Sequence, residues 1–256
     1  MKIATPVSHL FKIKSDAKKI AKHSDCVEVR PYSLDLNLAN QELFHCDHMQ
    51  PIHSMSEDDF EYIHTEVNKL TDLKLISFHC ASSCDKPILK NGMYHKGGYD
   101  YSAEEMKKNM RYNISRIKKI VGSTIKVAIE NNNYYPTTAY NHVTDASFIS
   151  DIVYENDIYF LFDNAHALVT CHNKKIDYEE YKNNLPMDKL IQIQFCKPSY
   201  SANLARDTHD LPTEEILKEV VELASKHKCE FLTLEYYKDV EKLADTLKKL
   251  KRMISE

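Results

Sequence analysis

A short run of apolar residues that ends in a histidine or an acidic residue recurs along this chain. The clearest example lies within the segment Ile158–Asn173, IYFLFDNAHALVTCHN, where Asp163 and His166 follow the apolar residues. An uninterrupted apolar run is typical of a strand buried on both faces, and polar residues at its carboxyl end are typical of a barrel mouth. Because a buried carboxylate is costly unless it is paired or binds a metal, this segment predicts a strand that presents metal ligands.

Eight segments have the composition of buried strands, and helical segments separate most of them. Alternating strands and helices predict a parallel sheet, and eight such strands in 256 residues predict an α/β fold of the (β/α)8 TIM-barrel type. Since no linker, repeat or break in composition divides the chain, we expect residues 1–256 to form a single domain. The predicted strands are Lys2–Val7, Cys26–Pro31, Glu42–His45, Leu73–His79, Lys126–Asn131, Ile158–Asp163, Leu190–Cys196 and Glu230–Tyr236.

Helix starts are marked by residues that cap the first turn. Ser56, Thr144 and Thr213 are predicted N-caps, and Ser102 with Glu105 forms a predicted capping box. A stretch with three glycines and a proline after His79, and a stretch that ends at Pro212, predict long loops. The predicted helices are 16–24, 56–70, 102–121, a helix that begins at Thr144 and includes Ile152, 213–226 and 240–253, and the predicted loops are 81–101 and 197–212.

Composition limits the classes of function. The formal net charge of −4 argues against a general binder of nucleic acid or of anionic membranes. The seven cysteines are odd in number and lack paired spacing, which is typical of free thiols in a reducing cytoplasm. The N-terminus lacks the apolar core of a signal peptide, and no 18-residue apolar run is present. We therefore expect a cytoplasmic protein that does not enter a membrane.

Closure of the predicted barrel would bring the polar strand ends to one mouth. Histidine and carboxylate ligands without cysteine suit hard or borderline metals such as zinc, manganese or iron. The set exceeds what one ion needs, so we expect two or more ions joined by bridging carboxylates. The candidate ligands are His45, His79, Glu130, Asp163, His166, Gln194, Asp207, His209 and Glu235.

Each of these residues also has an interpretation without a metal. A histidine at a strand end is more often a satisfied polar residue than a ligand, and Glu130 alone could pair with an arginine or lysine. The pair Asp207 and His209 could be solvated in a loop. It is the repetition of the same chemistry at separate strand ends that favours a metal site.

The ordered motifs resemble those of the xylose-isomerase-like barrel superfamily. This superfamily includes endonuclease IV, sugar isomerases and epimerases, and the multinuclear non-heme iron-dependent oxidative enzymes. Three stretches are similar to the last group: VAIENNNYY, FISDIVYENDIYFLFDNAHALVTCHN and RDTHDLPTEEI. The resemblance covers the segment from Leu73 to Tyr237 well and the N-terminal part only loosely.

The resemblance implies metal ligands at specific positions of this chain. In the early strand it implies His45, with His48 as a rival, and it departs at Gln194, where the family usually has histidine. An amide oxygen is a poorer ligand than imidazole, so Gln194 puts one ion in question. We expect two or three iron ions, with zinc or manganese as alternatives, and we expect Glu130, Asp207 and Glu235 to act in catalysis. The other implied ligands are His79, Asp163, His166 and His209.

The resemblance implies an iron-dependent enzyme that uses O2 to modify a ribosomally made peptide at cysteine. It also implies a peptide substrate that is recognised through a leader segment or a separate recognition protein. Three alternatives remain open: a phosphodiester hydrolase like endonuclease IV, a sugar isomerase or epimerase with Glu130 and Glu235 as acid and base, and a degenerate barrel that only binds a partner.

Overall fold

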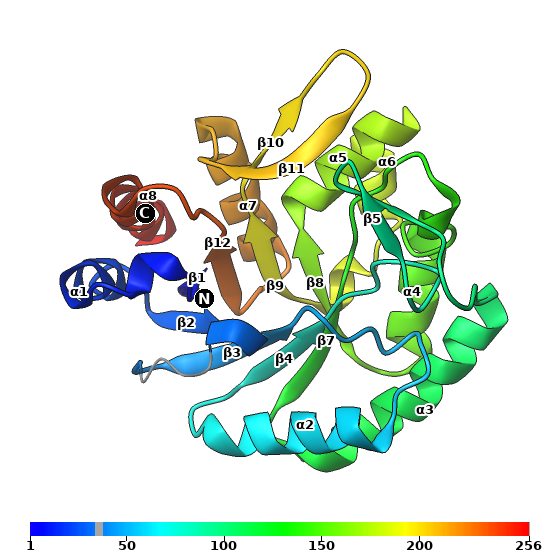
Figure 1. Cartoon of the computed structure of the whole chain (residues 1–256). Helices are drawn as coiled ribbons and strands as arrows, with labels where there is room; N and C mark the ends of the chain where they lie inside the picture. Colours follow the sequence, from blue (N-terminus) through cyan, green and yellow to red (C-terminus); the bar gives the residue numbers. More distant parts are fainter. Residues whose placement is uncertain (34–37, 256) are drawn as a thin grey trace.

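Eight parallel strands close into a barrel in the computed structural model, which describes residues 1–33 and 38–255 (Figure 1). Their order around the barrel is β1-β12-β9-β8-β7-β4-β3-β2. The predicted (β/α)8 barrel is therefore confirmed, and every predicted strand lies within two residues of an observed one at each end. The barrel strands are β1 (Lys2–Pro6), β2 (Cys26–Val29), β3 (Gln41–Cys46), β4 (Leu75–Phe78), β7 (Lys126–Glu130), β8 (Tyr159–Asp163), β9 (Leu190–Phe195) and β12 (Phe231–Leu234).

Helices surround the barrel (Figure 1). Aliphatic and aromatic side chains of the strands and helices form one buried core cluster. The first and the last helix, α1 and α8, lie side by side next to β1, so the two ends of the chain meet where the barrel closes. No helix among the described residues combines the length and the apolar character that a membrane span requires. The helices are α1 (Lys14–Ala21), α2 (Glu57–Lys69), α3 (Ala103–Val121), α4 (Ala146–Glu155), α5 (Asn164–Lys174), α6 (Tyr178–Asn183), α7 (Glu214–Lys226) and α8 (Val240–Ser255).

The inward-facing side chains change from apolar to polar along the barrel axis. A separate apolar cluster takes one residue from each of the eight strands, near the strand starts, and forms a floor. Since side chains alternate along a strand, the residue two positions after a floor residue faces inward again, except in β9, where the register shifts beside Ile191, and Gln192 and Gln194 face Glu28. In this way Leu43 is followed by His45, and Leu161 by Asp163. The floor consists of Ala4, Cys26, Leu43, Leu75, Ala128, Leu161, Ile191 and Phe231.

Two hairpins replace the predicted loops 81–101 and 197–212. The first pairs β5 (Ile88–Lys90) with β6 (Met93–His95), and the second pairs β10 (Lys197–Tyr200) with β11 (Ala205–Asp210). The turn of the first hairpin is Asn91-Gly92, with positive φ angles of 51° and 71°. Two successive positive φ angles are what a tight two-residue hairpin turn requires. The prediction of a loop for 81–101 missed the first hairpin because Gly92 was counted only as a loop signal.

The predicted helix starts are confirmed at three of four places. Ser56 and Ser102 each form a capping box, and Thr213 accepts a hydrogen bond from the first turn of α7. The prediction for Thr144 was wrong, because Asp145 stands at the N-cap of α4 and Thr144 is buried with its hydroxyl donating to the Tyr140 carbonyl. Helices α5 and α6 were not predicted.

Candidate metal centre

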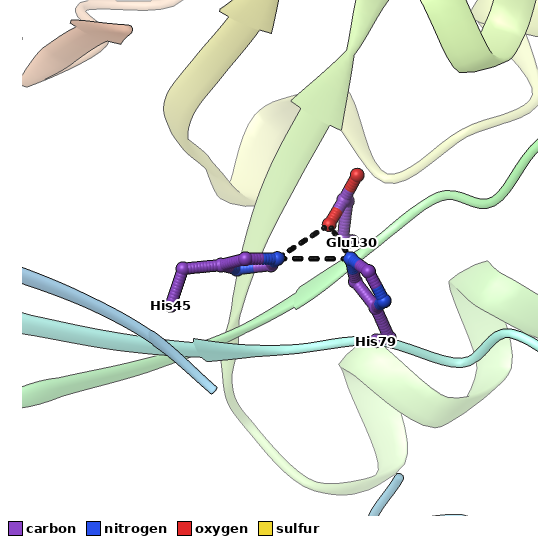
Figure 2. Close-up of side chains that lie close together, drawn as sticks. All are labelled: His45, His79 and Glu130. Atoms are coloured by element: carbon purple, nitrogen blue, oxygen red, sulfur yellow. Dashed lines mark hydrogen bonds and ion pairs between the residues drawn. The ribbon is translucent and has the colours of Figure 1, made fainter. Parts of the chain in front are cut away.

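His45, His79 and Glu130 converge at the mouth from three neighbouring strands (Figure 2). His45 lies in β3, His79 directly follows β4, and Glu130 ends β7. Nε2 of His45 lies 2.9 Å from Nε2 of His79. Glu130 Oε2 lies 2.9 Å from the His79 nitrogen and 3.3 Å from the His45 nitrogen. Three potential ligand atoms therefore face one point.

The protonation of this group favours a cation between its members. His45 is fully buried, and burial, with the nearby His79 and Arg30, lowers its pKa well below the usual value, which keeps the ring neutral. Glu130 Oε2 is buried and has no hydrogen-bond partner among the described residues. A carboxylate oxygen that faces two imidazole nitrogens without a hydrogen bond is satisfied by an ion that all three can ligate. The donor set thus fits a divalent metal.

Ser77 fixes the orientation of the His45 ring. Its Oγ lies 2.8 Å from His45 Nδ1, and it can accept a hydrogen from that nitrogen, which leaves Nε2 free to ligate. We expect Ser77→Ala to weaken metal binding by about 10- to 100-fold, because lost partners of histidine ligands typically cost that much. Ser82→Ala is the matched control, since Ser82 is also buried and hydrogen-bonded but does not contact His45. Competition with a metal-sensitive dye measures both affinities, and equal values for the two variants would rule out this role.

A second group of potential ligands consists of Glu130, Asp163 and His166, and the last two lie at the start of α5. Asp163 is the N-cap of α5, and its Oδ1 accepts a hydrogen bond of 2.6 Å from the His166 backbone N–H. The D-x-x-H spacing therefore places His166 at the third helical position, directly beside the cap. The other oxygen, Asp163 Oδ2, is buried without a hydrogen-bond partner in the described part of the chain. One oxygen thus holds the helix, and the other faces the site.

Glu130 links the two groups. Its Oε1 lies 2.8 Å from His166 Nδ1, while its Oε2 faces His45 and His79. His166 Nδ1 also lies 2.9 Å from the Asn131 carbonyl oxygen, which can only accept, so this nitrogen carries the proton in that contact. His166 Nε2 is then the ring nitrogen that could ligate an ion, on the side of Asp207. A carboxylate with one oxygen on each side suits a bridge between two ions.

The D-x-H motif lies on β11 of the second hairpin, and its two side chains reach the same mouth. Asp207 Oδ2 lies 3.4 Å from His166 Nε2 and 3.3 Å from His209 Nε2. His209 Nε2 also lies 3.0 Å from Glu235 Oε2. His209 has a φ of 47°, which is strained for a residue other than glycine and is common at functional sites. The thiol of Cys196 donates to Asp207 Oδ1 at 3.3 Å.

The charges of the cluster are strongly coupled. Burial acts to raise the pKa of Glu130, but the neighbouring His79 and His166 outweigh it and hold this pKa well below the usual range. Burial raises the pKa of Asp163 well above its usual range. Burial also acts to lower the pKa of His166, but Asp163 and Glu130 raise it well above the usual value. The protein thus holds a dense set of carboxylates that a bound cation would stabilise in the ionised form.

The structure brings eight of the nine predicted ligand residues into one continuous cluster. They contact one another through the distances given above. Gln194 faces inward as well, but its Nε2 donates to Glu28 at 3.0 and 2.9 Å, so only its Oε1 remains for other partners. The rival ligand His48 contacts the Cys46 thiol at 3.8 Å and the ring of Tyr62 instead.

Four residues of the site were not predicted as parts of it: Ser77, Glu28, Arg30 and Cys196. Arg30 forms ion pairs with Glu28 and Glu235, and Glu28 is fully buried. The strand segment CVEVRP carried a signal, because Glu28 and Arg30 are two residues apart and therefore share the inward face. Ser77 in LKLISFH lies two residues before His79 and shares its face in the same way.

The fold and the site together define a TIM-barrel enzyme with a candidate metal-binding site at its mouth. The sequence model of one family, described as RiPP precursor modification enzyme MbnB/TglH/ChrH, matches residues 99–255. The chain belongs to this family, whose description names the modification of the precursors of ribosomally made peptides. The matched region contains Glu130 and every later residue of the cluster.

Curated relatives match over a shorter region. A UPF0276 protein from Caulobacter vibrioides is 28% identical over 97 residues, which are 38% of this chain and 35% of that protein. A UPF0276 protein from Acaryochloris marina is 26% identical over 101 residues, which are 40% of this chain and 36% of that protein. The chain thus aligns with about a third of the length of each relative.

Solved structures with the same barrel match over nearly the whole chain. The 3-keto-D-glucoside 4-epimerase YcjR from E. coli has a TM-score of 0.63 and 13% identity, over 98% of this chain and 99% of that chain. D-psicose 3-epimerase from Clostridium cellulolyticum H10 has a TM-score of 0.61 and 12% identity, over 100% and 98%. SacUVDE has a TM-score of 0.55 and 14% identity, over 99% of each chain. At these identities the matches show a shared fold, the (β/α)8 barrel, and nothing about activity.

Proposed function

We propose that this chain is an iron-dependent oxidative enzyme that modifies a ribosomally made peptide at cysteine and uses O2 as the oxidant. The observation that carries the proposal is the bridging position of Glu130, between the pair His45 and His79 on one side and His166 on the other. Membership of a family of peptide precursor modification enzymes supports the substrate class.

The proposed ligand set would hold two ions. His45, His79 and Glu130 would hold one, and Asp163, His166, Asp207 and His209 would hold the other. Imidazole and carboxylate ligands suit iron and also zinc and manganese, so the metal itself has to be measured. When bound, iron would supply the one-electron chemistry with O2 that oxidation of a thiol requires. The proposed ligands are His45, His79, Glu130, Asp163, His166, Asp207 and His209. Gln194 and Glu235 are left out of this set, and their role as ligands stays a prediction. Gln194 already bonds Glu28, and Glu235 already bonds Arg30 and His209.

The residues of the chain determine how a substrate reaches the site. The apolar floor closes the barrel below the ligands, so a substrate would approach them through the mouth. The side chains of His79 and His209 are 25% and 32% exposed, whereas Glu130 is 2% exposed. A peptide would therefore enter beside the two exposed histidines. The Asp207 carboxylate lies beside His209, and its pKa is held below its usual value against the effect of burial, chiefly by His166 and His209, so it would stay ionised there.

Oxygen consumption by the iron-loaded protein tests the proposal. Protein purified without oxygen is loaded with iron, zinc or manganese and mixed with cysteine-containing precursor peptides, with the matching cysteine-to-serine peptides as controls. We expect O2 uptake and a mass change only with iron and only with the cysteine peptide. The proposal fails if iron supports no O2 uptake with any candidate peptide while zinc or manganese supports hydrolysis or isomerisation.

The low pKa of Glu235 argues against the sugar isomerase alternative, in which Glu235 would act as an acid or base. Burial acts to raise the pKa of Glu235, but Arg30 and His209 hold it well below its usual range. A general acid or base is most effective when its pKa lies near the operating pH. The hydrolase alternative is tested by incision of a duplex with an abasic site. A separate recognition protein and a cytoplasmic location remain predictions.

A further inference from the structure

Arg30 connects two buried carboxylates that come from different strands. Its NH2 nitrogen lies 3.1 Å from Glu28 Oε1 and also contacts Glu235 Oε1. Its Nε donates to Glu28 Oε1 at 3.3 Å, and its NH1 lies 3.8 Å from Asp47 Oδ2. The Arg30 side chain is 11% exposed, and those of Glu28 and Glu235 are 0% and 3% exposed. One nitrogen atom thus bridges two carboxylates inside the barrel.

Glu28 accepts hydrogen bonds from two amides as well as from Arg30. Gln192 donates to Oε2 at 2.7 Å, and Gln194 donates at 3.0 and 2.9 Å to the two oxygens. Gln192 also donates to the hydroxyl of Thr233 at 2.8 Å, which fixes its amide. Burial raises the pKa of Glu28, and the charge of Arg30 is the strongest influence that opposes this rise. The two amides are neutral, so Arg30 balances the charge of this fully buried carboxylate. Replacing Gln194 by histidine would remove donors that Glu28 uses.

We infer that Arg30 is a permanent internal cation that occupies the place of a metal ion between Glu28 and Glu235. A bridging ion would sit where the NH2 nitrogen lies, within bonding reach of one oxygen from each carboxylate. A divalent ion at that place would be repelled by the guanidinium, which stays charged at any physiological pH. Gln194, at a position where imidazole would favour metal binding, instead supports the arginine arrangement through Glu28.

This inference concerns the number of ions and rests on the proposed function only in assuming that the Glu130 cluster binds metal. Under this inference, ions bind next to Glu130 and next to Asp207 and His209 of the second hairpin. No ion binds between Glu28 and Glu235. Glu235 acts as a positioning residue, because it bonds both Arg30 and His209. The fixed positive charge also lies near His45, whose pKa it helps to lower.

Counting bound Mn²⁺ tests the inference without any assay of activity. The free ion is followed by EPR during titration of the full chain at constant pH. We expect Glu235→Gln to leave the number of bound ions unchanged, because the ion position at Glu235 is already filled by Arg30. We expect Arg30→Met, which keeps a long side chain but removes the charge, to bind one more ion per chain. Arg30→Lys, which keeps the charge, should bind the same number as the wild type.

A double variant makes the test specific. In the Arg30→Met background, Glu235→Gln should remove the additional ion, because it removes one of the two carboxylate charges. The inference is overturned if Glu235→Gln lowers the count in the wild type, or if folded Arg30→Met gains no ion. Should Arg30→Met fail to fold, the wild-type and Glu235→Gln counts still decide the matter. Loss of one ion in Glu235→Gln would leave the proposed function standing, whereas a wild type that binds no ion contradicts both.

Discussion

Replacing Glu130 by glutamine is expected to empty the metal centre and to abolish peptide oxidation. Glu130 Oε2 faces His45 and His79, and Oε1 faces His166, so one substitution weakens both ion positions. Loss of a partner behind a ligand commonly costs about 10- to 100-fold in metal affinity, and loss of a bridging ligand should cost at least about 100-fold. Metal analysis after dialysis and O2 uptake with the peptide measure the two effects.

Glu66→Gln is a suitable control for this variant. Glu66 is a buried glutamate in α2 that pairs with Lys69 and is not part of the cluster. It should keep the metal content and the activity of the wild type, which separates the loss of a ligand from the loss of a buried charge. A Glu130→Gln protein with a full complement of metal would contradict the proposed bridge.

Removal of the metal is expected to lower the thermal stability by roughly 10 °C. A ligand present at about 1,000 times its dissociation constant stabilises the folded state by ~4 kcal/mol. For a domain of about this size, each kcal/mol corresponds to roughly 2–4 °C in the melting temperature. Without a cation, the buried oxygens Glu130 Oε2 and Asp163 Oδ2 accept no hydrogen bond from the described residues, which is the physical source of the loss. Calorimetry with and without a chelator measures it.

The Glu130→Gln protein serves as the control for chelation, since its melting temperature should hardly respond to the chelator. The affinity of the wild type for the metal should also decrease as the pH falls. Burial raises the pKa of Asp163 in the metal-free protein, so an ion that binds has to displace the proton of this carboxyl group. An equal response of wild type and variant to the chelator, or no response of either, would show that the cluster holds no stabilising ion.

The barrel could be predicted because each of its strands has a recognisable local sequence pattern. Each apolar run of four to six residues ended near a polar residue, and the helices between them carried caps such as Ser56 and Ser102. The strand ends that carry His45, Glu130 and Asp163 could be recognised for the same reason. Barrel geometry then determines that these ends meet, whatever their separation in sequence.

The remaining features depend on relations that a linear pattern does not contain. Arg30 reaches Glu235 only because β1 alone separates β2 from β12 in the closed barrel, so the two ends of the chain meet there. Asp163 was predicted only as a metal ligand, but its Oδ1 also caps α5 by accepting a hydrogen bond from the His166 N–H. The D-x-x-H motif can therefore serve as a helix cap and as a source of ligands. The Asn91-Gly92 turn was available as a hairpin signal, but the flanking strands have only three residues each.

The layer of one floor residue per strand makes the barrel a cup with a sealed base. Different residues therefore determine stability and chemistry. The floor residues, which form the base, need only fill space, whereas the residues at the carboxyl ends of the strands, which form the rim, must present particular atoms. A lineage can exchange histidine for glutamine, or a metal ion for an arginine, at the rim without disturbing the base. At the rim of this chain, Arg30 and Gln194 both bond Glu28, and under the inference above Arg30 takes the place of an ion there.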